Sequence, residues 1–343
     1  MKKSAFVTGS TGFLGLNLID QLLKCGWKVY ALHRSTSDLT YLNRKDVIGV
    51  IGDVTDFDSL EAGVPEDIDI VFHAAANTDY WKRKNNIQTK VNVNGTKNIV
   101  DIVLKKGISR LVYTSSITAY GEHRSVIDEE TPSNALESVA NYFVTKKQSE
   151  DIVQEAIDKF DLDAVILCPS HILGPYDFRN WVKIIHLVNE NKLPGIPSGK
   201  GPFSHVSEVA QAHIIAADKA PKGSRYVLGG RYHSFLEVIN SIQEKLKRNK
   251  SKAATLQWIL HLGVHLHGFL GLMNRSKEPE LTREKLMLVS SDFQVDDSKA
   301  QQELGFRHIP IDEILDDCIS WLKSEGMISP VDSLDDIQSK TIG

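Results

Sequence analysis

The stretch TGSTGFLG at residues 8–15 decides the fold of this chain. A short apolar strand is predicted at residues 5–8, directly before it, and a helix at residues 12–24, directly after it. Gly26 then marks the end of that helix. A strand, a glycine-rich turn and a helix in this order are typical of a turn that binds the pyrophosphate of a dinucleotide.

The glycines of this turn have the spacing Gly9-x-x-Gly12-x-x-Gly15, which is one residue longer in its first gap than the usual fingerprint. Gly9 permits a sharp exit from the strand, Gly12 lets the backbone approach a phosphate, and Gly15 lets the helix pack on the sheet. A tight turn without a ligand is the alternative. The candidate cofactor-binding residues of the turn are Gly9, Thr11, Gly12, Phe13, Leu14 and Gly15.

Strands and helices alternate through the first half of the chain. The strands are short, continuous and β-branched, as in a parallel sheet that helices cover on both faces. The fold class is therefore α/β, with a Rossmann-type doubly wound parallel sheet. Further strands are predicted at residues 28–32, 47–51, 69–73, 110–114 and 164–168, and long helices at residues 87–106 and 139–160.

The alternation ends after Pro169, where helical patterns begin to dominate and glycine and proline form a loop at residues 194–202. A helix at residues 206–217 and a strand at residues 225–228 are expected to return to the sheet, within the segment 203–230. The chain then divides into a cofactor-binding Rossmann domain (1–170), a smaller, mostly helical substrate lobe (171–330) and a C-terminal tail (331–343).

The bulk composition is that of an ordinary soluble protein: 343 residues, 41% hydrophobic, 24% charged, with a net charge of −4. No excess of positive charge points to nucleic acid as a partner. Cys25, Cys168 and Cys318 form neither a disulfide framework nor a metal motif, which favours a reducing compartment. No signal peptide precedes the first strand, so we expect a cytoplasmic protein.

One segment, residues 255–273, is apolar enough to suggest a membrane helix, but His261, His265 and His267 interrupt it. We expect a buried or pocket-covering helix there and no membrane contact. His261 and His265 have the spacing of a metal pair, but nearby residues do not complete a metal motif, so no metal is expected.

The end of the second strand selects the cofactor. An NAD enzyme places an acid there for the ribose hydroxyl, whereas this chain has Arg34, which can grip the 2′-phosphate of NADP with paired hydrogen bonds. A solvated surface arginine is the alternative. Asp53 follows the third strand, where its carboxylate can accept from the adenine amino group, unless it caps the next helix.

The candidate catalytic groups lie later in the chain. Tyr142 and Lys146 share one helix face at i, i+4, and an ammonium beside a phenol lowers the phenol pKa from its usual value of about 10. Ser116 follows the fifth strand, at the sheet edge where ligands bind, and can orient a carbonyl oxygen toward the tyrosine. Turn chemistry is the alternative for the serine.

Taken together, these features resemble the extended short-chain dehydrogenase/reductase family, part of the NAD-dependent epimerase/dehydratase superfamily. The resemblance covers most of the chain. It rests on TGSTGFLG at 8–15, GDVTD at 52–56, FHAAA at 72–76, VNVNGTKN at 91–98, YTSSITAYG at 113–121, YFVTK at 142–146 and CPSHILGP at 168–175.

The resemblance implies roles for particular residues. Ser116 matches the catalytic serine, Tyr142 the proton donor or acceptor, and Lys146 the residue that also holds the nicotinamide ribose. Further positions that match the cofactor-lining residues of the family are Val54, Ala74, Ala75, Pro169, His171 and Ile172.

Within the family the chain looks most like the dihydroflavonol reductase branch, whose bacterial relatives include hopanoid-associated sugar epimerases. The resemblance implies an NADP-dependent reductase of a ketone or aldehyde, with a nucleotide-sugar epimerase that keeps NAD bound as the alternative. A protein that binds NADP without turnover is a third possibility. A 4,6-dehydratase is disfavoured, since Ile117-Thr118 replaces its Asp-Glu pair.

The substrate is expected to be bulky or apolar, because Tyr80 and Trp81 follow the fourth strand, although these rings could equally belong to the core. The helices at 87–106 and 139–160 match those that form the dimer interface in many relatives, so a homodimer is slightly favoured.

Overall fold

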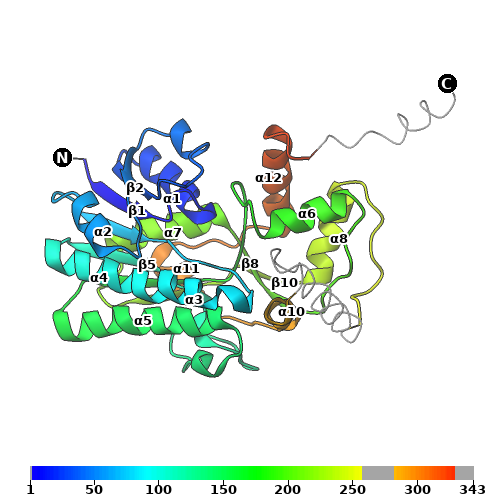
Figure 1. Ribbon diagram of the computed structural model, residues 1–343. Coiled ribbons are helices and arrows are strands. Elements are labelled where there is room, and N and C mark those ends of the chain that lie inside the picture. The colour runs from blue at the N-terminus through cyan, green and yellow to red at the C-terminus, as the bar shows by residue number, and fades with distance from the viewer. Residues whose placement is uncertain (1, 257–281, 329–343) are drawn as a thin grey trace.

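The computed structural model describes residues 2–256 and 282–328. Its centre is a sheet of seven parallel strands in the order β3-β2-β1-β4-β5-β6-β9 (Figure 1). The doubly wound α/β fold is thereby confirmed. The strands are β1 (Ser4–Thr8), β2 (Lys28–His33), β3 (Ile48–Ile51), β4 (Ile70–His73), β5 (Arg110–Thr114), β6 (Ala164–Pro169) and β9 (Arg225–Leu228).

The strand order reverses between β1 and β4, which lie side by side although the chain visits β2 and β3 between them. Thr8 at the end of β1 pairs with His73 at the end of β4. In open α/β sheets ligands bind at such a switch point, outside the carboxyl ends of the strands. The glycine turn after β1 therefore opens at the position where this fold places a ligand.

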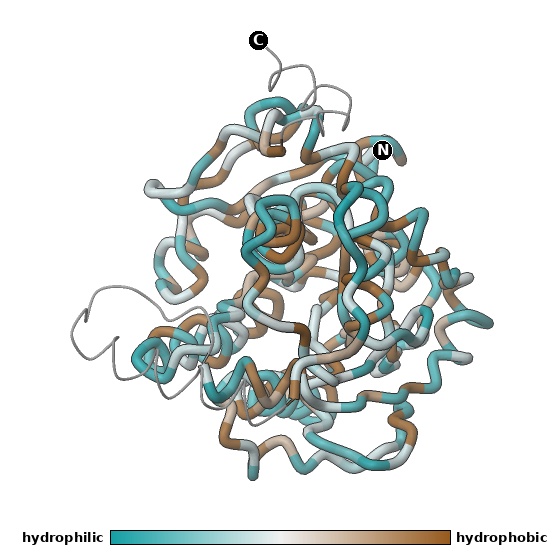
Figure 2. Tube along the Cα trace, turned by 90° about the vertical axis from the view of Figure 1, so that its right-hand side faces the viewer, coloured by the Kyte–Doolittle hydropathy of each residue, from teal (hydrophilic) through white to brown (hydrophobic). Residues whose placement is uncertain are grey.

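Helices cover both faces of the sheet and bury an apolar layer on each (Figures 1 and 2). Successive strand residues alternate between the two layers, so that Phe6 belongs to one core and Ala5 and Val7 to the other. One layer is formed with α2 (Phe57–Gly63), α4 (Gly95–Lys106) and α5 (Asn141–Phe160), and the other with α1 (Phe13–Lys24), α7 (Val206–Lys219) and α11 (Ser298–Leu304).

The helix predicted at residues 87–106 is not continuous. It consists of α3 (Asn85–Thr89), one turn of π-helix at Lys90–Asn94 and then α4, which ends at Gly107 in the left-handed conformation. A π turn holds one extra residue per turn and is frequently found at functional sites. Hydrophobic periodicity does not reveal the π turn, because the buried side chains of α3 and of the π turn are polar, Gln88 and Asn92.

The smaller lobe combines a three-stranded sheet with helices (Figure 1). The predicted loop at residues 194–202 was wrong at its end, because Lys200, Gly201 and Pro202 begin a strand that is paired on both sides. The elements are β7 (His171–Leu173), β8 (Lys200–His205), β10 (Arg231–Ser234), α6 (Trp181–Asn189), α8 (Phe235–Lys245), α10 (Arg283–Ser290) and α12 (Ile311–Ser324), with short 3₁₀ turns elsewhere at Leu42–Arg44, Lys82–Lys84, Ile117–Tyr120 and Ala135–Glu137.

The chain crosses between the two parts several times. We expected a return near residues 203–230, and α7 lies against α1 there while β9 forms the edge of the large sheet. A later segment, α11, also packs against α7 and β9, although no motif in its sequence predicts a position outside the small lobe. The predicted helix at 255–273, apart from its first two residues, and the tail at 331–343 lie outside the described residues.

In residues 2–256 and 282–328, no helix has both the length and the apolar character that crossing a bilayer requires.

Candidate active site

The glycine turn has the close approaches that its spacing predicts. Gly9 has φ of +68°, and a Cβ on Gly9 would lie 2.8 Å from the Ala74 backbone. A Cβ on Gly15 would lie 2.1 Å from the Gly9 carbonyl oxygen. Gly12 is exposed, and a Cβ there would meet only the Gly9 oxygen, at 3.1 Å. The outer surface of the turn at Gly12 is therefore open to a ligand.

The first turn of α1 offers backbone donors to such a ligand. Gly12 is the N-cap residue and makes no side-chain capping bond, so the first N–H groups of the helix are not satisfied by a cap. Phe13 and Leu14 are partly exposed, as is Thr11 before them. This cradle fits the pyrophosphate of a dinucleotide, because its donors and helix dipole favour an anion.

The end of β2 carries a free cation. Arg34 is exposed, and in the described part of the chain its guanidinium forms no hydrogen bond or ion pair. Its backbone closes a turn, since the Arg34 N–H donates to Ser37 Oγ at 3.1 Å and the Ser37 N–H donates to the Arg34 oxygen at 3.0 Å. This turn places an arginine and two hydroxyls, Ser35 and Ser37, where the second strand ends.

Asp53 does not cap the helix that follows it. That role belongs to Asp56, whose carboxylate accepts from the Ser59 N–H at the start of α2. Asp53 Oδ1 accepts from the Thr55 N–H at 2.8 Å, which leaves its other oxygen for a ligand. Val54 is buried, and a Cβ on Gly95 would lie 2.9 Å from its Cγ2 atom, so Val54 fixes the turn against α4.

A buried histidine fixes the loop that follows β4. The Ala75 N–H donates to Thr8 Oγ1 at 3.1 Å, and Thr8 Oγ1 lies 2.7 Å from His73 Nδ1. His73 Nε2 lies 3.1 Å from Thr96 Oγ1, whose own proton goes to the Asn92 carbonyl at 2.6 Å. Since the Thr96 proton is already used, Thr96 Oγ1 accepts from His73 Nε2. Nδ1 is then the acceptor for the Thr8 hydroxyl, and the ring is neutral. Burial lowers the pKa of His73 to about 3, which is consistent with this neutral state.

Ser116 and Tyr142 are brought together after β5 and at the start of α5. Ser116 Oγ accepts from the Thr118 N–H at 3.2 Å and lies 2.9 Å from Thr118 Oγ1. Burial raises the pKa of the Tyr142 phenol to about 12, and the hydrogen bond with the Ser116 hydroxyl opposes that rise. Since Thr118 donates to Ser116, the serine proton is left to point at the phenol or at a substrate oxygen.

Lys146 is buried one helical turn beyond Tyr142. Its Nζ atom donates to the Thr114 carbonyl at 2.7 Å and to Tyr113 Oη at 3.3 Å. We expected Lys146 to lower the phenol pKa, whereas the pKa of Tyr142 is raised. The reason is that burial dominates at the phenol, while the ammonium is directed to the end of β5.

Sequence reasoning missed Asn92, which lies in the π turn. Its side chain accepts from the Asn77 N–H at 2.7 Å and donates to the Asn77 carbonyl at 3.1 Å and to Thr145 Oγ1 at 3.0 Å. Asn92 thus joins the loop after β4 to the helix that carries Tyr142 and Lys146. The motif VNVNGTKN held the available signal, because a buried polar side chain in a helix interior needs partners from elsewhere.

Neighbouring residues at and after the end of β6 pack against different parts of the molecule. Pro169 ends β6 beside Leu228, and Ile172 packs at the edge of the core on the α1 side. His171 does not face the glycine turn with its side chain, because the ring is enclosed by aromatic residues of the small lobe. Its ring centroid lies 5.1 Å from that of Phe203, 5.4 Å from that of Phe235 and 6.5 Å from that of Trp181.

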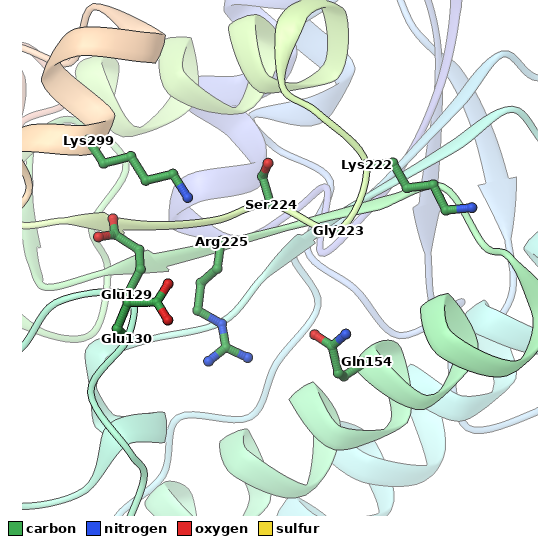
Figure 3. Close-up of a pocket in the computed structure, with 8 residues that line it drawn as sticks. All are labelled: Glu129, Glu130, Gln154, Lys222, Gly223, Ser224, Arg225 and Lys299. Carbon is green, nitrogen blue, oxygen red and sulfur yellow. The ribbon is translucent and has the colours of Figure 1, made fainter.

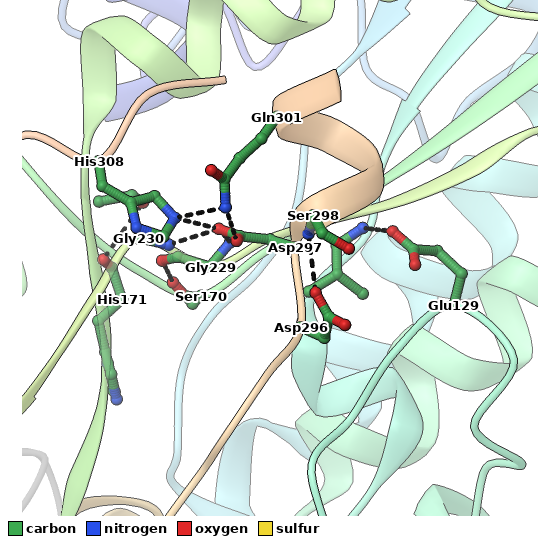
Figure 4. A network of polar contacts seen from close by, with 12 residues as sticks. Glu129, Ser170, His171, Gly229, Gly230, Asp296, Asp297, Ser298, Gln301 and His308 are labelled. Carbon is green, nitrogen blue, oxygen red and sulfur yellow. Dashed lines mark hydrogen bonds and ion pairs between the residues drawn. The ribbon is translucent and has the colours of Figure 1, made fainter. Parts of the chain in front are cut away.

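A network of hydrogen bonds fixes this segment from behind (Figure 4). Ser170 donates to the Gly229 carbonyl, and the Gly229 and Gly230 N–H groups donate to Asp297 Oδ2 at 3.1 and 2.9 Å. His308 Nε2 lies 2.7 Å from the same oxygen. Burial by itself would raise the pKa of Asp297, but these hydrogen bonds outweigh it and lower the pKa.

An aromatic side chain lies beside the Tyr142 phenol. The Tyr80 ring lies edge-on to the Tyr142 ring, with centroids 5.4 Å apart. Thr282 Oγ1 donates to the Tyr80 carbonyl at 2.6 Å, and Met287 and Leu288 of α10 pack against the same cluster. The Tyr80 ring therefore lies beside Tyr142 and is tied to the start of α10 through Thr282.

Within the two described ranges, no group of three or more His, Cys, Asp or Glu side chains is placed to hold a metal ion.

Comparisons with known proteins give a consistent picture. A family model described as the NAD dependent epimerase/dehydratase family matches residues 5–229. The chain is 29% identical to a Synechocystis protein provisionally named dihydroflavonol 4-reductase, over 94% of this chain and 95% of that protein. It is 27% identical to sterol demethylase protein B of Methylococcus capsulatus, over 95% of this chain and 100% of that protein. The crystal structure of gox2253 aligns with a TM-score of 0.81 and 26% identity, over 96% of this chain and 100% of that one.

Proposed function

The chain belongs to the NAD dependent epimerase/dehydratase family, and from that premise we propose that this NAD(P)-dependent enzyme is an NADP-dependent reductase of a ketone or aldehyde. The observation that carries the proposal is Arg34. Its free guanidinium stands at the end of β2, where an enzyme specific for NAD needs a carboxylate. A planar cation with paired donors suits the 2′-phosphate of NADP.

The residues that would hold the cofactor follow from the geometry. The glycine turn and the first turn of α1 would bind the pyrophosphate, Arg34 the 2′-phosphate and Asp53 the adenine. When bound, the cofactor supplies a hydride to the carbonyl carbon. Positioning and proton transfer are left to the protein.

The proton chemistry belongs to the catalytic trio. Ser116 donates a hydrogen bond to the carbonyl oxygen and so holds that oxygen beside Tyr142. Because burial raises the pKa of Tyr142 to about 12, the phenol is protonated at neutral pH and ready to act as a general acid. It gives its proton to the oxygen as the carbonyl becomes an alcohol, and Lys146 stabilises the phenolate that remains. The phenol is thus in the protonation state that reduction of a carbonyl requires.

The substrate is proposed to carry its carbonyl on a bulky apolar scaffold. The aromatic Tyr80 ring beside Tyr142 supports this, since apolar walls bind apolar ligands best. The two relatives described above support it as well, because their names refer to a dihydroflavonol and a sterol, both multi-ring compounds.

The test begins with purification of the protein and measurement of any nucleotide it retains. NADPH oxidation is then followed with a series of multi-ring ketones and, in parallel, with nucleotide sugars under epimerase conditions. We expect turnover with a ketone and loss of roughly 10²-fold or more in Tyr142→Phe, the scale of general acid catalysis. Tightly retained NAD together with interconversion of a nucleotide sugar would replace the reductase with the epimerase.

A further inference from the structure

A buried carboxylate on α5, one helical turn from the catalytic lysine, pairs with an arginine on β9. Glu150 follows Lys146 by four residues on α5, so both side chains emerge from one face of the helix. The Glu150 side chain is 2% exposed, and its Oε2 atom lies 3.1 Å from Nη2 of Arg225 on β9. Its other oxygen accepts from the buried thiol of Cys168 at 3.4 Å.

From this arrangement we infer that Glu150, held by Arg225 and Cys168, is a positioning residue that keeps the buried ammonium of Lys146 charged. The inference rests on the proposed use of Lys146 and adds a residue outside the trio. Nothing in the catalytic step itself requires Glu150 to touch the substrate or the cofactor.

Burying the Lys146 ammonium costs free energy. An ammonium taken out of water is strongly destabilised unless an opposite charge lies close to it. Burial lowers the pKa of Lys146 to about 8, and the Glu150 charge opposes this fall. The Lys146 amine is therefore poised near physiological pH, where a moderate change in its surroundings decides its charge.

Four other titratable groups around Lys146 are neutral at pH 7. Tyr142 on α5, Tyr113 on β5 and Cys168 on β6 all have a raised pKa, and His73 on β4 has a lowered one. These four groups are consequently neutral at pH 7. Glu150 therefore brings a negative charge next to Lys146 that these four groups do not, and its partner Arg225 brings a positive one.

Arg225 does not cancel the effect of the Glu150 charge on Lys146, because the two side chains differ in their exposure to water. The Arg225 side chain is 26% exposed and lines an open cavity of about 400 Å³, among other charged side chains (Figure 3). Water in this cavity screens the guanidinium, whereas Glu150 is enclosed and one helical turn from Lys146. Lys146 therefore experiences the carboxylate more strongly than the guanidinium. The cavity is lined by Glu129, Glu130, Gln154, Lys222, Gly223, Ser224, Arg225 and Lys299.

The test is the pH dependence of turnover in Glu150→Gln, which keeps the shape of the side chain and removes its charge. We expect the alkaline loss of kcat to begin about one pH unit lower, so that kcat at pH 8 falls about fivefold while kcat at pH 6 stays within twofold. Glu150→Asp keeps the charge and should keep the alkaline limb of the wild type.

The matched control is Glu208→Gln. Glu208 is another buried glutamate, 4% exposed and paired with Arg307 at 2.6 Å, but it lies on α7, on the opposite face of the sheet from α5. It should lose stability without moving the alkaline limb. If Glu150→Gln does not fold, the double variant Glu150→Gln/Arg225→Gln removes the carboxylate and its guanidinium partner together and should shift the limb in the same direction.

A readout that needs no substrate separates this inference from the proposed function. An NMR titration of the Lys146 side chain, assigned with Lys146→Arg, should show a lower pKa in Glu150→Gln than in the wild type. An unchanged lysine pKa, or a loss of kcat that is equal at all pH values, would overturn the role of Glu150. Absence of ketone reduction with a shifted lysine pKa would overturn only the proposed reaction.

Discussion

Tyr142, Lys146 and Arg34 are three side chains whose behaviour depends on how much water surrounds them. Burial raises the pKa of the Tyr142 phenol and lowers that of the Lys146 ammonium, because a low-dielectric environment disfavours the charged form of each. Arg34 is exposed and keeps its full charge available for a ligand. In the proposed reaction, proton transfer would thus take place in the interior, and recognition of the 2′-phosphate at the surface.

Cofactor preference can be tested at Arg34. A charge-assisted, paired contact with the 2′-phosphate is worth roughly 1.5–3 kcal/mol, which corresponds to about ten- to a hundredfold in affinity. NADPH should therefore bind at least tenfold more tightly than NADH. Arg34→Ala should remove most of that difference and leave NADH binding nearly unchanged. Titration by nicotinamide fluorescence measures both affinities, and equal affinities in the wild type would contradict the NADP assignment.

Thr118 is expected to direct the proton of Ser116. Thr118→Val keeps the volume of the side chain and removes the hydroxyl that lies 2.9 Å from Ser116 Oγ. We expect kcat/KM to fall about two- to tenfold, the scale of one neutral hydrogen bond, with little change in NADPH affinity. Thr118→Ser restores the hydroxyl and should recover most of the activity. A Val variant as active as the wild type would show that Ser116 needs no such orientation.

At the scale of elements, the unit formed by β1, the glycine turn and α1 separates two roles of glycine. Gly15 is required for folding, since a Cβ would lie 2.1 Å from the Gly9 oxygen. Gly12 faces outward, and a Cβ there meets that oxygen only at 3.1 Å. The same residue type therefore serves packing at one position and ligand access at the other.

Two alanine substitutions distinguish these roles. Gly15→Ala forces helix and turn apart, so we expect a loss of roughly 1–3 kcal/mol in the free energy of unfolding together with weaker NADPH binding. Gly12→Ala should cost less than about 1 kcal/mol of stability, yet weaken NADPH binding tenfold or more, because its methyl group occupies the approach of the phosphate. Denaturant unfolding and fluorescence titration give both quantities. Full NADPH affinity in Gly12→Ala would place the pyrophosphate elsewhere.

At the scale of the whole molecule, buried neutral histidines link stability to pH. His73 and His213 lie in the interior, and burial lowers their pKa values to about 3 and about 4. His213 donates from Nδ1 to the Val209 carbonyl and accepts from Thr114 Oγ1, so its neutral form is built into the packing of α7 on β5.

The free energy of unfolding depends on pH because the folded and the unfolded chain bind different numbers of protons. Below about pH 6.5 the unfolded chain binds protons that the folded chain excludes, so the free energy of unfolding should fall as pH decreases. Each of these two histidines contributes up to about 1.4 kcal/mol per pH unit until its folded pKa is reached. Urea unfolding at pH 7.5, 6 and 5 measures the slope. His73→Gln should be less stable at pH 7.5 but show a smaller slope, and a pH-independent stability over this range would contradict the neutral state.

How much of the molecule the sequence determined depends on the distance along the chain over which each feature acts. The strands at residues 110–114 and 225–228 have the predicted bounds, and the glycine turn has the predicted geometry, because hydrophobic runs and glycine spacing act over a few residues. The positions of Ser116, Tyr142 and Lys146 followed from motifs of the same local kind. The parallel order of the strands followed from their alternation with helices.

Only the tertiary structure decided the features that depend on contacts between distant segments. Lys200–Pro202 become a strand because β10 pairs with them, and His171 turns into the small lobe because aromatic residues from three later elements enclose it. The rise in the Tyr142 pKa likewise depends on burial. The pairing of Glu150 with Arg225 joins a residue on α5, which covers one face of the sheet, to a residue on the edge strand β9. Burial and long-range pairing are products of packing, and no local pattern in the sequence specifies them.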